Sequence, residues 1–246
     1  MNNNNNNISV LEWDSNFFGF PIARVNKNQI RKTDSRAINS FCEKYNIRLL
    51  QFQCEANDAL SILTAESMGF HFADYRVNYS MSVPEGELAN IVLPDGFFVG
   101  YGRQLDLPNL AVIAGTIYRD SRYYFDKNFP RNKVKEFYQN WIVKSVLGQF
   151  DDFTLVLYCN SLAIGFICIS LEGDAARFSL VGMHQKYAKK GLGLIFVAKV
   201  IKILKNRGIK SINTITQGRN IRAQNFYNRA GFSINQVEIY YHYWIN

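Results

Sequence analysis

The segment 183–193 constrains the fold of this chain most strongly. It joins an apolar alternating stretch, which ends at Met183, to a helical stretch, which begins at Leu192. It contains Gly191 and Gly193, together with three lysines, Lys186, Lys189 and Lys190. Glycines at the start of a helix let backbone N–H groups approach an anion, and the helix dipole favours negative charge there. The segment lacks the GK(S/T) ending of a P-loop, and Phe196 stands where a dinucleotide-binding fingerprint needs its third glycine. We therefore predict a strand–loop–helix unit that binds phosphate in another way.

The pattern around this segment indicates an α/β architecture with a mixed sheet. Apolar alternation predicts strands at 153–158, 162–171, 177–183, 210–215 and 233–244, and helical periodicity predicts helices at 192–206 and 220–229. The stretch 153–171 carries no charge and approaches the length of a transmembrane helix. Because a polar turn, Cys159-Asn160-Ser161, interrupts it, we interpret it as a hairpin of buried strands and expect no membrane association.

In the first half of the sequence, the pattern predicts strands at 21–25, 48–53 and 70–83 and helices that begin at Asp34 and Asn57. After these, it predicts a strand at 97–101 and helices at 108–118 and 133–150. Turn-rich segments at 84–87 and 94–96 favour a boundary near residue 90. We expect a disordered Asn-rich tail at 1–7, a smaller α/β domain at 8–90 and a larger one at 91–246. A helix–glycine–phenylalanine joint occurs in both halves, at Gly69 and at Gly231, which is either a trace of duplication or a common joint.

Composition limits the partners of the chain. The 246 residues carry 28 Lys and Arg against 20 Asp and Glu, and the resulting net charge of +8 favours anionic ligands. Because the basic residues are spread along the chain without a nucleic-acid motif, we expect no nucleic-acid binding. The cysteines form no C-x-x-C pair, which indicates free thiols and no metal. Met1 is followed by asparagines instead of a signal peptide, so we expect a cytoplasmic location.

Downstream of the glycine segment, Asn220, Ala223, Tyr227, Gly231 and Phe232 form a second spaced motif. With Tyr187, Gly191 and Gly193, it resembles the paired acetyl-CoA motifs of the GNAT N-acetyltransferase superfamily. The first motif departs from the superfamily pattern at positions 183, 185, 188 and 189. Ala188, in place of the usual Arg or Gln, removes a usual pyrophosphate contact, which Lys189 and Lys190 would replace.

A narrower resemblance, to the TDP-fucosamine acetyltransferase family, covers nearly the whole chain. It rests on the stretch 11–19, which includes Phe17 and Phe18, and on Ser121-Arg122-Tyr123 followed by the stretch 137–142, which includes Trp141. The resemblance implies a GNAT fold with a mixed, mostly antiparallel sheet, preceded by a smaller, truncated GNAT-like α/β domain. It also implies transfer of acetyl from acetyl-CoA to the amino group of a dTDP-4-amino-4,6-dideoxyhexose for surface polysaccharide synthesis.

The resemblance also assigns functions to residues. Tyr227 would protonate the leaving thiolate, unless it is only a packed helix aromatic. Residues expected to bind acetyl-CoA are Val181, Met183, Lys189, Lys190, Gly191, Leu192, Gly193, Asn220, Ala223 and Phe226. Residues expected to bind the acceptor are Phe17, Phe18, Arg122, Tyr123 and Trp141, with a surface ion pair as the alternative for the arginine and core packing for the aromatics. Gly182 suggests a bulge beside the reacting groups.

Several alternatives stay open from the sequence. His184 is either the general base or a solvent-facing loop residue. The acceptor is alternatively a peptide, a protein or another small amine, and a binding-only descendant of the fold is a further alternative. The identity of the sugar, nucleotide and acyl group stays undetermined, as does the oligomeric state, for which a homodimer is one alternative.

Overall fold

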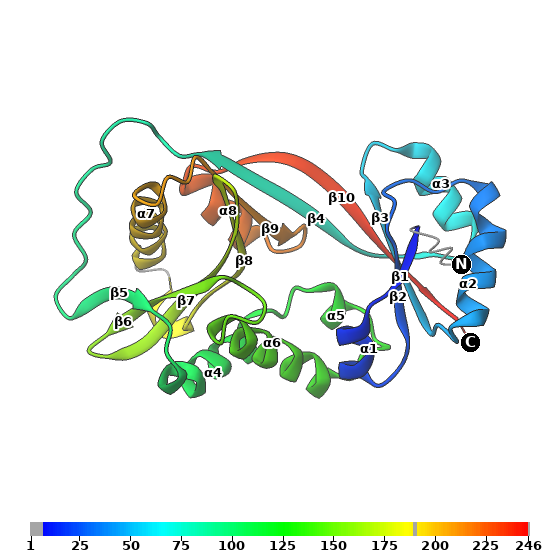
Figure 1. The fold of residues 1–246 in the computed structure, drawn as a ribbon, viewed down its shortest axis with the longest axis horizontal. Helices are drawn as coiled ribbons and strands as arrows, with labels where there is room; N and C mark the ends of the chain where they lie inside the picture. The colour runs from blue at the N-terminus through cyan, green and yellow to red at the C-terminus, as the bar shows by residue number, and fades with distance from the viewer. Residues whose placement is uncertain (1–6, 189–190, 246) are drawn as a thin grey trace. The chain divides into compact units, whose positions relative to one another are not determined.

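The computed structural model describes residues 7–188 and 191–245 and divides the chain into two compact units (Figure 1). Unit 1 comprises Met1–Val77, Gln217–Arg219 and Gln236–Asn246, and unit 2 comprises Asn78–Thr216 and Asn220–Asn235. The compact units are therefore not consecutive halves of the chain. The boundary expected near residue 90 lies within unit 2, because the chain passes between the units inside strands β4 (His71–Ser82) and β10 (Ser233–Trp244).

Unit 1 is a small α/β unit with the strand order β1-β2-β3-β10-β4. Its further elements are β1 (Ile8–Val10), α1 (Glu12–Phe18), β2 (Ile22–Val25), α2 (Ser35–Lys44), β3 (Leu49–Glu55) and α3 (Ala59–Ser67). Strands β2 and β3 are parallel, whereas β3 and β10 are antiparallel, with Phe52 opposite Tyr241. Apolar side chains of β3, β10 and α2 form its core, among them Leu50, Phe52 and Ile38.

Two details of unit 1 differ from the sequence prediction. Asp58, not Asn57, caps α3, because its side chain accepts a hydrogen bond from the backbone N–H of Ser61 at 3.0 Å. Helix α1 was not expected. Its signals are local: two acidic residues in its first turn, and Gly19 in the left-handed conformation (φ +83°) at its C-terminus.

Unit 2 has the strand order β4-β9-β8-β7-β6-β5 beside the start of β10. Its strands are β5 (Phe97–Tyr101), β6 (Phe153–Cys159), β7 (Leu162–Glu172), β8 (Ala175–Met183) and β9 (Ser211–Gln217). Its helices are α4 (Leu107–Ile117), α5 (Arg122–Phe125), α6 (Arg131–Val146), α7 (Leu192–Lys205) and α8 (Ile221–Arg229). Strands β5 to β8 pair antiparallel, and β8 and β9 pair parallel, as expected for a mixed, mostly antiparallel sheet.

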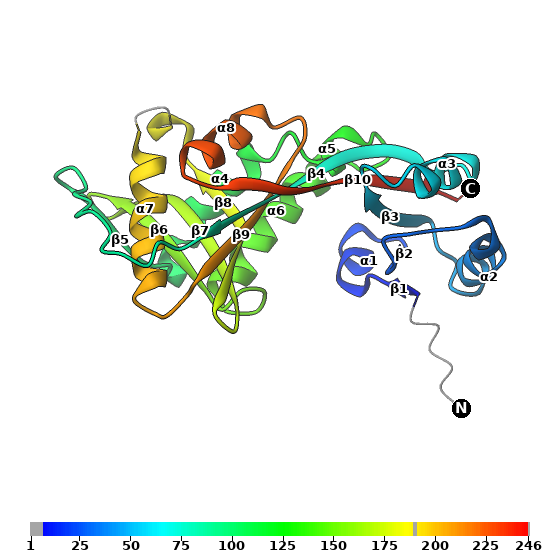
Figure 2. The same ribbon diagram turned by 90° about the horizontal axis from the view of Figure 1, so that it is seen from above.

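Helices cover both faces of this sheet. In Figure 1, α4 and α6 lie on one side of β6 and β7 and α7 lies on the other, and Figure 2 shows the same arrangement from above. The stretch 153–171 forms the hairpin of β6 and β7, which confirms the strand interpretation. Among the helices that the structure describes, none is long and apolar enough to cross a membrane. The described residues likewise contain no cluster of three or more His, Cys, Asp or Glu side chains able to hold a metal.

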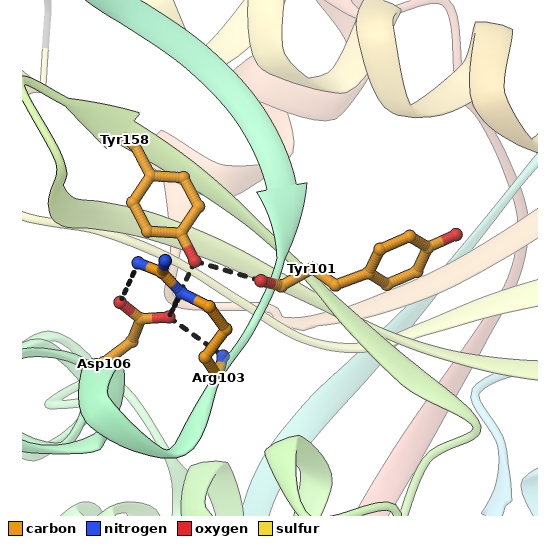
Figure 3. A network of polar contacts seen from close by, with 4 residues as sticks. All are labelled: Tyr101, Arg103, Asp106 and Tyr158. Atoms are coloured by element: carbon orange, nitrogen blue, oxygen red, sulfur yellow. Dashed lines mark hydrogen bonds and ion pairs between the residues drawn. The ribbon is translucent and has the colours of Figure 1, made fainter.

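A polar network anchors the N-terminus of α4 to β6 (Figure 3). The buried carboxylate of Asp106 accepts hydrogen bonds from the Arg103 backbone N–H at 2.9 Å and from its Nε at 3.1 Å. The Tyr158 hydroxyl on β6 donates to the same carboxylate at 2.7 Å. Burial alone would raise the pKa of Asp106, but the hydrogen bonds from Arg103 and Tyr158 outweigh it, and the pKa lies below its ordinary value.

We expect Asp106→Asn to lower the free energy of unfolding by about 1–3 kcal/mol at pH 7, because hydrogen bonds to a buried charge are lost. A pKa lowered by folding contributes stability that is present above the ordinary Asp pKa of about 3.9 and is lost as the pH falls through the folded-state value. The difference in the free energy of unfolding between wild type and variant, measured by denaturant unfolding, should therefore become smaller as the pH is lowered from 7 to 3. Asp120→Asn, at an exposed carboxyl, is the control. A difference independent of pH would contradict the argument.

Candidate active site

The central feature of unit 2 is the place where two parallel strands part. Strands β8 and β9 pair from Ala175 opposite Ser211 to Phe178 opposite Thr214. Beyond this point β8 continues to Met183 and β9 to Gln217, but the described residues of the two strands no longer pair. The end of β8 therefore pairs only with β7 on its other side, and its free edge can offer backbone N–H and C=O groups to an extended ligand.

A β-bulge lies at the start of this free segment. The pairing of β7 with β8 shifts between Ile169 opposite Phe178 and Cys168 opposite Leu180, which leaves Ser179 as the extra residue. The bulge expected at Gly182 is therefore three residues away from the observed one. An extra residue bends and twists its strand, and this accounts for the departure of β8 from β9 directly after Phe178.

Gly182 has a different function, which is to let a helix approach the strand. A Cβ atom at this position would lie 2.5 Å from Cζ of Phe166 and 2.6 Å from Cδ1 of Ile117. Ile117 is the last residue of α4, so the absence of a side chain at Gly182 allows the end of this helix to contact β8.

Two tyrosines, Tyr227 and Tyr118, lie at the parted strands, and Tyr227 is on the β9 side. Tyr227 on α8 is buried, and its ring centroid lies 5.4 Å from that of Tyr79 and 5.7 Å from that of Phe232. Burial raises its pKa to about 12, against a smaller opposite effect of a hydrogen bond with the Thr214 side chain. Thr214 is the last residue of β9 that pairs with β8. The Tyr227 hydroxyl is therefore a neutral proton donor at the β9 side of the split.

Tyr118, which the sequence analysis did not single out, reaches the β8 side. It follows α4, and its hydroxyl donates a hydrogen bond to the carbonyl oxygen of Val181 at 2.8 Å. Its ring stacks on that of Tyr138 on α6, with centroids 4.5 Å apart. Burial, with a smaller electrostatic contribution from Tyr227 among others, raises the pKa of Tyr118 well above its ordinary value. No local sequence signal predicts this contact, because 63 residues separate the two partners.

The expected cofactor residues gather beside the end of β8. Gly191 starts α7 in the left-handed conformation (φ +75°), and a Cβ there would meet no atom within 4 Å. A Cβ at Gly193 would lie 3.0 Å from Cε2 of Phe226 on α8 and 3.9 Å from Cε of Met183. The structure thus brings Met183, Gly193 and Phe226 together, with Leu192 buried next to Gly193. Lys189 and Lys190 lie outside the described residues.

Two polar residues of the predicted motifs cap helices. The Asn220 side chain accepts a hydrogen bond from the Ala223 backbone N–H at 3.0 Å and so starts α8. The exposed His184 accepts one from the Lys186 backbone N–H at 3.2 Å through Nδ1, which starts the 3₁₀ turn at 185–187. This contact occupies the lone pair with which a general base at Nδ1 would act.

The expected acceptor residues fall into both units. In unit 2, the Arg122 guanidinium lies 4.3 Å from the ring of Tyr123 and donates to its hydroxyl at 2.8 Å. Tyr123 is buried against Phe129, which is the packing alternative that the sequence left open, and Trp141 stacks on Tyr138. Phe17 and Phe18 belong to unit 1, at the end of α1.

Comparison with known proteins places unit 2 beside one family of enzymes by similarity. Residues 115–232 match the model of the acetyltransferase (GNAT) family. The chain is 23% identical over 167 residues to the spore coat polysaccharide biosynthesis protein SpsD of Bacillus subtilis, a match that covers 65% of this chain and 57% of the relative. The chain thus spans little more than half the length of that relative.

Two solved structures show the same fold at low sequence identity. A GCN5-related N-acetyltransferase from Sphaerobacter thermophilus superposes with a TM-score of 0.66 at 11% identity, over 96% of this chain and 76% of that one. A tandem GNAT protein from the clavulanic acid biosynthesis pathway gives 0.62 at 12% identity, over 91% and 75%. The chain has the GNAT fold, as the sequence resemblance predicted.

We expect Gly182→Ala to destabilise unit 2 by about 1–3 kcal/mol, because the added methyl group overpacks the contact between α4 and β8. Thermal and denaturant unfolding measure the loss. Gly86→Ala is a matched control, since a Cβ at Gly86 meets no atom within 4 Å. Equal stability of the two variants would show that α4 does not need this close approach.

Proposed function

We propose that this chain is an acetyl-CoA-dependent N-acetyltransferase that acetylates the amino group of a nucleotide-linked sugar, and the GNAT match over residues 115–232 supports the acetyl transfer. The acceptor best supported is a dTDP-4-amino-4,6-dideoxyhexose. The observation that carries the proposal is the parting of β8 and β9 with a buried, protonated Tyr227 beside it. The sugar is supported by the sequence resemblance at 11–19 and 121–142 and by similarity to a polysaccharide biosynthesis protein.

The residues present fit acetyl-CoA, which supplies the activated acetyl thioester when bound. The free edge of β8 suits the extended pantetheine arm at Met183 and at the Val181 N–H, since the Val181 carbonyl is already bonded to Tyr118. The open space at Gly191, before the first turn of α7, suits the pyrophosphate, because backbone N–H groups and the helix dipole attract anions there. Lys189 and Lys190 would add charge to this loop.

The acetyl group passes directly to the amine in this proposal, without an acyl-enzyme. Burial raises the pKa of the Cys168 thiol to about 12, and the Cys42 and Cys54 thiols are raised to about 11, so none of these three is a thiolate at neutral pH. The amine nitrogen bonds to the carbonyl carbon as the C–S bond breaks. Backbone N–H groups near Val181 stabilise the oxygen charge that develops. Tyr227 gives its proton to the departing sulfur and regains one from the nitrogen.

The raised pKa of Tyr227 fixes the sign of the pH dependence. Its hydroxyl stays protonated up to a pH of about 12, so the general acid is present throughout the usual range. The rate should therefore rise with pH as the acceptor amine loses its proton, and it should then level off. A fall in rate between pH 8 and 10 caused by loss of the Tyr227 proton is not expected.

We expect Tyr227→Phe to lower kcat by roughly 100-fold, with little change in acetyl-CoA affinity, because only the proton donor is removed. Thiol release and calorimetric titration with acetyl-CoA measure the two quantities. Tyr101→Phe, which removes an exposed hydroxyl bonded to Arg207, is the matched control. Turnover at the wild-type rate in Tyr227→Phe would assign Tyr227 to packing alone.

The acceptor class needs its own test. A diphosphate-linked acceptor should depend on a cation, and Arg122 is our candidate because a guanidinium can bind phosphate through two hydrogen bonds. We expect Arg122→Ala to reduce kcat/KM for the nucleotide-linked sugar about 10- to 100-fold, in keeping with lost charge-assisted hydrogen bonds. The free amino sugar should be unaffected, and Arg131→Ala, at an exposed arginine bonded to the Tyr124 carbonyl, is the control.

The competing hypothesis is a peptide, protein or other small-amine acceptor. Wild-type enzyme that acetylates free and nucleotide-linked amino sugar equally well, or that prefers a peptide amine, would overturn the sugar-nucleotide proposal. The acetyltransferase assignment itself would then stand, because it does not depend on the acceptor.

A further inference from the structure

Tyr118 is held in place by contacts at both ends of the helix that precedes it. At the N-terminus of α4, Asp106 is hydrogen-bonded to Tyr158 of β6 at 2.7 Å. At the C-terminus, Ile117 packs where Gly182 of β8 leaves room. The next residue, Tyr118, is therefore placed on β8 by a rigid element, with its ring fixed by stacking on Tyr138.

The hydrogen bond of Tyr118 determines what its oxygen can still do. A phenol has one proton and two lone pairs. The proton is used in the 2.8 Å hydrogen bond to the Val181 carbonyl. No described residue donates a hydrogen bond to the Tyr118 oxygen. The oxygen is therefore an acceptor with a fixed orientation, and it lies against the strand segment that has left β9.

The two tyrosines thus contact opposite strands of the split. Tyr227 is associated with Thr214 on β9, and Tyr118 is bonded to Val181 on β8. Both hydroxyls stay protonated at neutral pH, because burial raises both pKa values. Tyr227 is the proposed proton donor, and its hydroxyl is bonded to a side chain, Thr214. The Tyr118 proton points at a backbone carbonyl, so the Tyr118 oxygen offers a ligand its lone pairs.

We propose that Tyr118 is a second catalytic tyrosine, whose oxygen accepts a hydrogen bond from an N–H of the acceptor amine and so directs the nitrogen lone pair at the thioester. This inference rests on the proposed acetyl transfer but not on the identity of the sugar. The proton balance is that given above: the N–C bond forms, the C–S bond breaks, and Tyr227 supplies and regains the proton. Tyr118 neither gains nor loses a proton, since its own stays on the phenol oxygen and points at the Val181 carbonyl.

The test is Tyr118→Phe, which keeps the ring and its stacking and removes only the hydroxyl. We expect kcat/KM for the amine to fall about 10- to 100-fold, the range for a misdirected nucleophile. Acetyl-CoA affinity and the slow hydrolysis of acetyl-CoA by water, measured without amine, should stay within about twofold of wild type. The ratio of aminolysis to hydrolysis is therefore the readout, and Tyr101→Phe is the control.

The outcomes separate this inference from the acceptor proposal. A lowered ratio, with unchanged melting temperature and acetyl-CoA affinity, supports Tyr118 as the residue that orients the amine. An equal loss of aminolysis and hydrolysis, or no loss of either, overturns it, because the hydroxyl then serves only the position of β8 or has no function. The assay uses whichever amine in a panel of nucleotide-linked sugars, free amino sugars and peptides the wild type acetylates fastest. If the wild type acetylates other amines in the panel but not the nucleotide-linked sugars, only the proposed identity of the acceptor is refuted.

Discussion

The parting of β8 from β9 after Phe178 and Thr214 is the constraint on which the candidate active site depends. Parallel strands that stayed paired would use every backbone group in the ladder and leave no edge for a ligand. The extra residue at Ser179 bends β8 away, while its pairing with β7 continues to Met183. The sheet therefore keeps its order on one side of β8 and exposes a backbone edge on the other. Tyr118 and Tyr227 are functional candidates because they stand at this edge.

Helix α4 positions Tyr118 at β8, and two contacts of different kinds hold the helix in place. A charged network with Asp106 fixes its N-terminus, and a steric contact at Gly182 fixes its C-terminus. We expect a loss at either end to move Tyr118 relative to Val181, which would couple the stability of unit 2 to the proposed orientation of the amine.

Burial gives the two tyrosines their chemical character. Water would allow each phenol to exchange hydrogen bonds freely, whereas the buried site raises both pKa values and keeps both protons in place. The same effect keeps Cys168 a thiol, and so a covalent route through this residue is disfavoured. A site with neutral tyrosine donors and a protonated Cys168 suits direct attack by an amine that arrives without its proton.

The sequence by itself determined most of the strands and helices and several of their ends, although helix α1 and the cap of α3 at Asp58 were not predicted. Apolar alternation predicted the β6–β7 hairpin, the glycine at 191 marked the start of α7, and the motif at Asn220 marked a helix start that its side chain does cap. These features depend on neighbours in the chain, so the pattern of residues carries them. Only the tertiary structure decided the bulge at Ser179, the steric reason for Gly182 and the meeting of Tyr118 with Val181. Each arises where segments far apart in the chain pack together, and no periodicity or local motif records which strand a side chain will meet.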